Sequence, residues 1–461
     1  RDVKEILEQY DWVGYRANTH PDQIAVTDVS GESLTYLALN REVSLAAGWI
    51  RELGISDGQR VAVLAKGDIK FIILAHAIPR AGGLFLPLNQ RLTENELSFQ
   101  LDNSHAKLLL TDSAYERNAA NLVENIQTEV VTLDGAIWGA SSPLCADASI
   151  DSDTAHTVIY TSGTTGAPKG ALITWSNFYW SAVASAENLG VAQSDRWLAC
   201  MPLFHIGGLS IILRSAIYGT EVLIHEGFDA IRVNAALRED GVTLLSVVAT
   251  MLRRMLDADD DSYPSTVRAV LVGGGPVPKE LLLRARERGL NVLQTYGLTE
   301  TASQVATLNA SDALRKLGSA GLPLSAVTLS IAASDGISDA GSNEIGEILV
   351  SGPIVTPGYL DSPEANQSAL RDGWFHTGDI GYRDDEGYLY IADRRDDLIV
   401  TGGENVYPAE VEAALMQDES VYEAAVIGLE DQQWGSIVVA VIVPTAGTEL
   451  DSEVIIDRLR P

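Results

Sequence analysis

The sequence predicts an α/β protein with a large N-terminal domain of several layered subdomains and a small α+β C-terminal domain. Short apolar runs alternate with helical patterns, which is typical of helices packed in layers against sheets. From Gly346 the pattern changes to short alternating runs separated by Gly, Asp and Asn turns, which indicates a more β-rich region. The length of 461 residues, with 46% hydrophobic content, exceeds what one compact core usually holds.

Apolar runs bounded by turn residues predict the strands of the large domain, and amphipathic stretches predict its helices. The expected strands are 61–64, 108–110, 158–161, 171–173, 197–201, 222–224 and 269–272. The expected helices are 45–53 and 280–288.

A charged run, DRRD at 393–396, precedes the expected small domain. VYPAEVEAALMQ predicts a helix with a proline near its start, and AAVIGLED and IVVAVIVP predict two strands. We therefore place the domain junction at about residue 396, which gives a large domain of residues 1–395 and a small one of 396–461.

The composition excludes several classes of function. The 63 acidic and 32 basic residues give a net charge of −31, and such a field repels nucleic acid and anionic lipid. No run approaches the roughly 18 uncharged apolar residues of a membrane span, and the N-terminus lacks the apolar centre of a signal peptide. Cys145 and Cys200 have no metal-like spacing. We expect a cytoplasmic protein without nucleic-acid partners; a homodimer is compatible with the sequence.

A glycine-rich loop follows the expected strand 158–161. Its glycines permit backbone geometries in which successive N–H groups face one anion, and hydroxyls and a lysine add donors suited to a polyphosphate. The spacing is not GxxxxGK[ST], so the P-loop NTPase pattern fails, and an ordinary hairpin loop is the remaining alternative. The candidate phosphate contacts are Thr161, Ser162, Gly163, Thr164, Thr165, Gly166 and Lys169.

The run YTSGTTGAPKG at 160–170 resembles the phosphate-loop signature of the adenylate-forming superfamily, which comprises acyl-CoA synthetases, adenylation domains and luciferases. Further motifs follow in the family's order along almost the whole chain. The resemblance implies a mobile C-terminal domain. It also implies activation of a small-molecule carboxylate, with ATP, Mg²⁺ and CoA as ligands.

Two motifs carry the adenine and magnesium expectations. GGGP at 273–276 follows an apolar strand, and a turn without side chains lets a flat base approach the backbone. QTYGLTE at 294–300 resembles the family segment in which Tyr296 would stack on adenine and Glu300 would ligate Mg²⁺. Alone, these would be a core aromatic and an exposed acid. The ATP contacts expected here are Gly274, Gly275, Pro276, Thr295, Tyr296, Gly297 and Thr299.

Two further motifs resemble the family's ribose and hinge segments. WFHTGD at 374–379 supplies Asp379 as the ribose-binding carboxylate, and Arg394 matches an arginine that contacts ribose and phosphate. Asp396 falls at the hinge. In isolation these would be a turn acid and a solvated charged run. The catalytic set that the resemblance implies is Lys169, His205, Glu300 and Arg394.

The acyl site is expected after strand 197–201, where PLFHIGGLS resembles the motif that carries the aromatic gate. His205 is the gate candidate, and the alternative is an ordinary histidine at a helix start. The longer run PLFHIGGLSIILRSAIYGT is most similar to the o-succinylbenzoate–CoA ligases of menaquinone synthesis.

A succinylbenzoate keeps a second carboxylate after the first is activated, and a buried anion needs a cationic partner. Ser210 and Arg214 are four residues apart on one face of the expected helix. We take Arg214 as the partner, with Ser303 as a polar neighbour; a surface arginine is the alternative. The acyl-binding candidates are His205, Gly207, Ser210, Arg214 and Ser303.

TGGENVYP at 401–408 resembles the loop that reaches the pantetheine tunnel after the small domain rotates. Gly402, Gly403 and Glu404 are its expected tunnel residues. The family carries a lysine near its C-terminus, and no such motif precedes Pro461. We therefore expect the small domain to be incomplete and this chain to bind ATP but adenylate poorly.

The predicted reaction converts 2-succinylbenzoate, ATP and CoA to 2-succinylbenzoyl-CoA, AMP and diphosphate through an acyl-adenylate. The alternatives are an aryl- or fatty-acyl-CoA synthetase, or a non-catalytic nucleotide-binding relative. A peptide-synthetase adenylation domain is disfavoured because its amino-group-binding Asp is not apparent. The presence of Lys169, Glu300, Asp379 and Arg394 argues against the non-catalytic alternative.

Overall fold

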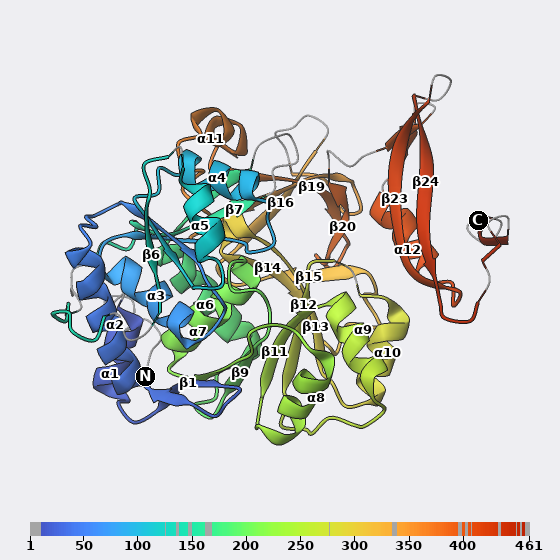
Figure 1. Ribbon diagram of the computed structural model, residues 1–461. Coiled ribbons are helices and arrows are strands. Elements are labelled where there is room, and N and C mark those ends of the chain that lie inside the picture. The colour runs from blue at the N-terminus through green and yellow to red at the C-terminus, as the bar shows by residue number, and fades with distance from the viewer. Residues whose placement is uncertain are drawn as a thin grey trace.

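The computed structural model consists of a large α/β domain followed by a small unit built around a long hairpin (Figure 1). The predicted fold class is confirmed. The described residues are 11–124, 126–134, 138–145, 150–161, 168–275, 277–333, 339–394, 399–401, 404–406, 408–431, 435–448, 450–451 and 454–456.

One sheet of the large domain has six strands, parallel except for the last. β8 turns back against β7, as the expected strand–loop–strand arrangement around the glycine-rich loop requires. In sheet order the strands are β6 (Glu129–Thr132), β5 (Leu108–Thr111), β3 (Arg60–Leu64), β4 (Leu84–Pro87), β7 (Ala155–Thr161) and β8 (Lys169–Thr174).

The second sheet begins with a mainly parallel half. In sheet order its strands are β2 (Ser33–Thr35), β1 (Ile24–Asp28), β10 (Glu221–Ile224), β9 (Arg196–Ala199), β11 (Leu244–Val248), β12 (Ala269–Gly273) and β13 (Val292–Leu298). Only the edge strand β2 is antiparallel to its neighbour in this half.

The antiparallel half continues from β13. Its strands are β14 (Ser303–Leu308), β15 (Ser319–Pro323), β20 (Leu389–Arg394), β19 (Trp374–Arg383), β17 (Gly346–Ser351) and β16 (Thr328–Ala332), with β18 (Leu370–Arg371) beside β19. The β-rich region therefore begins at Ser303, earlier than the predicted Gly346, because the sequences of β14 (SQVATL) and β15 (SAGLP) lack a regular alternation of apolar and polar residues.

Helices connect and cover the strands of both sheets (Figure 1). They are α1 (Trp12–Thr19), α2 (Tyr36–Glu52), α3 (Ile69–Arg80), α4 (Glu94–Asn103), α5 (Glu116–Leu122), α6 (Trp175–Leu189), α7 (Ile206–Tyr218), α8 (Ala230–Glu239), α9 (Ala249–Ala258), α10 (Lys279–Glu287), the 3₁₀ turn η2 (Thr299–Thr301) and α11 (Pro363–Ala369).

The predicted elements exist, but several boundaries differ. The expected helix 45–53 is only the second half of α2, whose true start is capped by the Thr35 hydroxyl, which accepts from the Ala38 N–H. The expected strand 197–201 ends at Ala199. Lys169, expected in the glycine-rich loop, is the first residue of β8.

The largest apolar core lies between helices and both sheets, and Val61, Phe71, Trp197 and Leu209 are among its fully buried members. Burial of this kind is the dominant favourable contribution to folding. It fixes the helices that carry the candidate site.

The small unit contains β21 (Ile399–Thr401), β22 (Glu404–Val406), α12 (Pro408–Leu415), β23 (Val421–Asp431) and β24 (Gly435–Pro444). Pro408 begins α12 as predicted, and the two expected strands lie within β23 and β24. The predicted domain junction lies at 395–396, outside the described residues.

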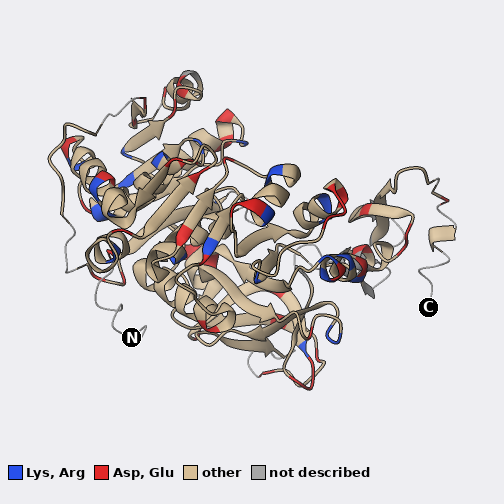
Figure 2. Ribbon diagram, turned by 90° about the horizontal axis from the view of Figure 1, so that it is seen from below, with Lys and Arg blue, Asp and Glu red and all other residues tan. Residues whose placement is uncertain are grey.

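Acidic residues are spread over helices and loops of both units, with basic residues among them (Figure 2). No described helix has the length and apolarity needed to cross a membrane.

Candidate active site

The candidate site is built where strands of both sheets end. The parallel register of β12 and β13 pairs Val272 with Gln294, so Gly274 lies level with Tyr296 just past the end of β12. Thr161 ends β7 in the other sheet. Loops at the carboxyl ends of parallel strands are where ligands bind in open α/β sheets.

Lys169 and Glu300, which are far apart in sequence, both contact Tyr359. The Tyr359 hydroxyl donates to Glu300 Oε1 at 2.9 Å, and Lys169 Nζ lies 5.5 Å from the centre of the Tyr359 ring. Burial and then the Glu300 charge raise the pKa of Tyr359, so its proton remains available for this hydrogen bond. Tyr359 therefore contacts both the cation and the carboxylate.

Tyr359 is a site residue that the sequence did not reveal. Its segment is joined to β8 by hydrogen bonds from Leu172 N to Gly358 O (3.0 Å) and from Leu360 N to Gly170 O (2.8 Å). Thr356 N donates to Glu300 O at 2.7 Å. The only signal in the sequence was the TPGYL turn, which has no distinctive spacing.

The adenine and ribose candidates also meet. The Tyr296 hydroxyl donates to Asp379 Oδ2 at 2.6 Å, and Asp379 is only 5% exposed. The β19–β20 register places the backbone of Arg394 directly opposite Asp379. Three residues of three separate motifs thus converge, and Asp379 is not an isolated turn acid.

Different features of the structure favour glycine at different positions in these motifs. Gly274 (φ +78°) and Gly275 (φ +158°) adopt positive φ, and a Cβ on Gly275 would meet nothing within 4 Å, which leaves backbone open to a ligand. A Cβ on Gly297 would lie 1.7 Å from Ser303 O, so the bulged β13–β14 pairing itself requires this glycine.

The hydroxyl of Thr295, a predicted ATP contact, is already engaged within the sheet. It donates to Ala306 O at 3.0 Å and lies 3.1 Å from Thr307 Oγ1. Thr299, predicted to bond a phosphate, begins η2, the turn that also carries Glu300.

The gate candidate His205 is the N-cap residue of α7 and lies against Phe204, with ring centres 4.6 Å apart. Desolvation by neighbouring groups lowers the pKa of the His205 ring, and the positive charge of Arg91 lowers it further. His205 is therefore neutral at physiological pH. Gly207 and Gly208 lie in the first turn of α7, where a Cβ on Gly208 would lie 2.3 Å from Pro202 O.

Arg214 is buried, with 3% of its surface exposed, so the surface-arginine alternative is wrong. Its Nη2 donates to Ser181 Oγ at 3.1 Å, and the Ser181 hydroxyl donates to Ala302 O at 2.8 Å. Within the described residues, Arg214 Nε has no hydrogen-bond partner and the guanidinium has no ion pair. Burial lowers the pKa of Arg214, and the nearby Tyr218 opposes this shift.

Ser303 directly follows Ala302, the residue whose carbonyl accepts from Ser181. Ala302 (φ 50°) and Ser303 (φ 112°) both have positive φ, an unfavourable backbone geometry for side-chain-bearing residues that is common at functional sites. Ser210 is buried, and its hydroxyl reaches only Gly207 O at 3.4 Å.

Several predicted residues lie outside the described part of the chain. They are Ser162, Gly163, Thr164, Thr165, Gly166, Pro276, Asp396, Gly402 and Gly403. The backbone of Glu404 begins β22. No group of three or more His, Cys, Asp or Glu side chains that could hold a metal occurs among the described residues, so a cation at Glu300 would need further oxygen ligands from the nucleotide.

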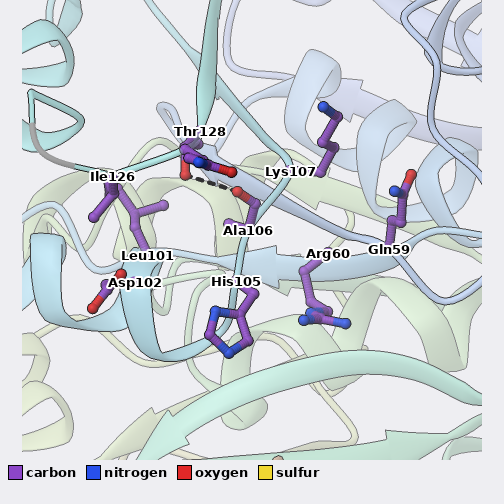
Figure 3. Close-up of a pocket in the computed structure, with 10 residues that line it drawn as sticks. Gln59, Arg60, Leu101, Asp102, His105, Ala106, Lys107, Ile126 and Thr128 are labelled. Atoms are coloured by element: carbon purple, nitrogen blue, oxygen red, sulfur yellow. Dashed lines mark hydrogen bonds between the residues drawn. The ribbon is translucent and has the colours of Figure 1, made fainter.

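A cavity of about 540 Å³ lies at the opposite, amino-terminal edge of β3, β5 and β6. Arg60 and His105 point to one side of it, whereas Lys107 points to the other (Figure 3). Arg60 Nη1 donates to Gly58 O at 3.3 Å, and its Nε donates to Ser104 O. The polar groups that line this cavity do not converge. We therefore assign the catalytic chemistry to the carboxyl ends of the strands and not to this cavity.

The fold and these paired motifs define a nucleotide-binding enzyme with a large layered domain and a small C-terminal one. The model of the AMP-binding enzyme family matches residues 14–360, and that of the AMP-binding enzyme C-terminal domain matches residues 410–461. The chain belongs to the AMP-binding enzyme family.

Individual relatives carry a more specific name. The 2-succinylbenzoate–CoA ligase of Bacillus cytotoxicus is 42% identical over 446 residues, which cover 96% of this chain and 90% of the relative. The o-succinylbenzoate CoA synthetase of Bacillus subtilis, solved with its acyl-adenylate intermediate, is 38% identical at a TM-score of 0.90, covering 97% of this chain and 90% of that chain. The same protein solved with ATP and a magnesium ion also gives a TM-score of 0.90, covering 97% and 92%.

Proposed function

We propose that this chain is an AMP-forming 2-succinylbenzoate–CoA ligase. Near full-length similarity to such ligases supports the reaction. One observation in the structure supports 2-succinylbenzoate as the substrate. The guanidinium of Arg214 is buried and lacks a carboxylate partner among the described residues.

In the first half-reaction, a carboxylate oxygen of the substrate attacks the α-phosphorus of ATP, and the bond to pyrophosphate breaks. Lys169 supplies positive charge near the transferred group, while Asp379 and Tyr296 hold the ribose and the base. Glu300, oriented by Tyr359, would hold Mg²⁺, which neutralises phosphate charge when bound. Positioning and charge neutralisation supply most of the catalysis.

In the second half-reaction, the CoA sulfur attacks the acyl carbonyl, the bond to AMP breaks, and the thiol proton is released. We assign His205 as the gate because it begins α7, the helix that also carries Arg214. Gly402, Gly403 and Glu404 are assigned to the CoA tunnel by the motif alone. We place the reaction in the cytoplasm, where ATP and CoA are available.

Arg214 would bind the carboxylate that is not activated. A charge-assisted hydrogen bond in a buried site is worth more than a neutral one and also fixes the orientation of the ligand. Ser181 and the strained turn at Ala302–Ser303 would form the polar neighbourhood of that group.

The test is AMP release by the purified full-length protein with ATP, CoA and a panel of 2-succinylbenzoate, benzoate, malonate and a medium-chain fatty acid. We expect the highest kcat/KM with 2-succinylbenzoate. Equal or higher values with the fatty acid or benzoate would identify a synthetase of different specificity, and no AMP release with any acid would support a non-catalytic relative.

A further inference from the structure

The strand that carries Asp379 bulges beside its neighbour. The pairing of β17 with β19 shifts between Glu347 and Leu349, so Ile348 alone lies opposite three residues of β19, Thr377 to Asp379. The central residue of this bulge, Gly378, has a φ of +76°, which favours glycine. Bulges of this kind change the direction in which a side chain points. The direction of the Asp379 carboxylate therefore depends on what holds residues 377–379 in place.

Glu347 of β17 contacts the bulge at two points. Its Oε1 accepts from the Gly378 N–H at 3.2 Å, and its Oε2 lies 3.0 Å from Nδ1 of His376, the residue just before the bulge. Both side chains are largely buried, with 14% of Glu347 and 12% of His376 exposed. The backbone of Glu347 pairs with Ala332 of β16 on one side and Ile380 of β19 on the other, so the carboxylate is mounted on a fixed strand.

A second side chain completes the support of the bulge. The Thr377 hydroxyl donates to Ile348 O at 2.8 Å and accepts from the Asp379 N–H at 3.0 Å. Glu347 and Thr377 thus supply acceptors for the N–H groups of Gly378 and Asp379, whose residues have no paired position in β17. The Asp379 carboxylate itself accepts from the Tyr296 hydroxyl. The supported bulge therefore directs this carboxylate towards the adenine candidate.

We propose that Glu347 is a positioning residue for ATP, which holds the bulge and so aims the Asp379 carboxylate at the ribose hydroxyls. This inference rests on the proposed function, in which Asp379 holds the ribose. Glu347 contacts Gly378 and His376, and its effect reaches the nucleotide only through Asp379. Loss of the contact to Gly378 N–H lets the bulge relax and weakens the ribose contact. The acyl site on α7 is not changed.

The experiment measures the Kd for ATP by calorimetry and the KM for 2-succinylbenzoate in variants of the full-length protein. We expect E347A to raise the Kd for ATP about tenfold and to leave the KM for 2-succinylbenzoate unchanged. E347Q keeps an oxygen that accepts from Gly378 N–H, so its Kd should stay within about twofold of wild type. The matched control is E344A, because the exposed Glu344 also accepts a backbone N–H, that of Gly341 at 2.9 Å, but outside the bulge; its Kd should not change.

A nucleotide without the ribose hydroxyls separates positioning from a general effect on the sheet. For 2′,3′-dideoxy-ATP, the Kd should be higher than that for ATP in wild type and should be the same in wild type and E347A, because the contact that Glu347 positions is already lost. An equal rise for both nucleotides in E347A, or an unchanged Kd for ATP, would overturn the proposal. If E347A does not fold, E347D replaces it, since the shorter side chain keeps the charge but not the reach to Gly378, and the same results are expected.

The outcomes distinguish this inference from the function on which it rests. Equal affinity of wild type for ATP and 2′,3′-dideoxy-ATP would refute the ribose role of Asp379 and this inference with it. AMP release with another acid but not with 2-succinylbenzoate would refute the proposed substrate, while the expected difference in Kd between E347A and E347Q would still support the positioning role of Glu347.

Discussion

Arg80 and Arg214 are both buried in the large domain, on two helices that contribute to the same core, but they differ in how many partners compensate their charge. Arg80 on α3 donates to Asp11 Oδ1 at 2.7 Å and to Ser44 Oγ and Asn40 Oδ1 at 2.8 Å each. Arg214 on α7 donates only to Ser181 Oγ among the described groups. The first charge is neutralised within the protein, and the second is not.

The difference distinguishes a buried charge that the protein itself compensates from one that stays uncompensated among the described residues, as the proposed substrate contact requires. Removing a charge from water costs several kcal/mol, and only close partners offset this cost. Arg16 provides a third case, because its guanidinium donates to Ala216 O and Ile217 O at the end of α7. Of these three, Arg214 has the fewest partners, which is the expected state of a residue whose partner is a substrate carboxylate.

The largest effect is expected from breaking the ion pair between Arg80 and Asp11. D11N leaves the Arg80 charge buried without its counter-ion and should lower the free energy of unfolding by roughly 3–5 kcal/mol. Urea denaturation measures it, with D22N at an exposed site as the control. A loss below about 1 kcal/mol would mean that Ser44 and Asn40 suffice to hold Arg80.

Acid should weaken the same region through His76, which lies one turn before Arg80. Burial lowers the pKa of His76 from 6.5 to about 4, with Asp11 opposing and Arg80 reinforcing the shift. The neighbouring His156 has its pKa lowered too, by burial and then by His76.

Because the unfolded chain binds this proton below pH 6.5 and the folded chain does not, stability is complete above pH 6.5 and falls towards pH 4. The expected loss from His76 is about 3 kcal/mol. H76Q should show a shallower pH dependence of unfolding between pH 7 and 4.5, whereas H105Q, at an exposed site, should match the wild type. Identical slopes for H76Q and wild type would refute this assignment.

R214L removes the buried charge of Arg214, which no acidic group among the described residues neutralises. We expect kcat/KM for 2-succinylbenzoate to fall about 100-fold, the effect of losing a buried charge-assisted contact, with KM for ATP unchanged. The free energy of unfolding should stay the same or rise, because an uncompensated buried charge is removed. A large loss of stability, or an unchanged KM for 2-succinylbenzoate, would show that Arg214 is structural like Arg80.

S181A should have the smallest effect. It removes the hydroxyl that positions Arg214, so KM for 2-succinylbenzoate should rise about fivefold, which corresponds to roughly 1 kcal/mol. Steady-state kinetics measures it, with S185A on the same helix as the control. A fall in kcat/KM as large as that of R214L would instead indicate direct contact with the substrate.

Much of the site could be predicted from local sequence. Lys169, Glu300 and Asp379 could be named because their runs resemble motifs that occur in the same order in the adenylate-forming superfamily. The partners could not be predicted, because Tyr359 and Ser181 belong to ordinary turn and helix sequences and become significant only through contacts with distant residues. Gly297 shows the converse, since its motif suggested a ligand contact while the close approach of Ser303 O explains it.

The sequence by itself determined the α/β class, the order of the motifs and the face of α7 that carries Ser210 and Arg214, because periodicity and turn chemistry act within a few residues. Tertiary structure alone decided that Tyr359 contacts both Lys169 and Glu300, that Tyr296 meets Asp379, and that Arg214 is buried without an acidic partner among the described residues. Those facts depend on which surfaces pack together, and packing joins residues that no local pattern relates.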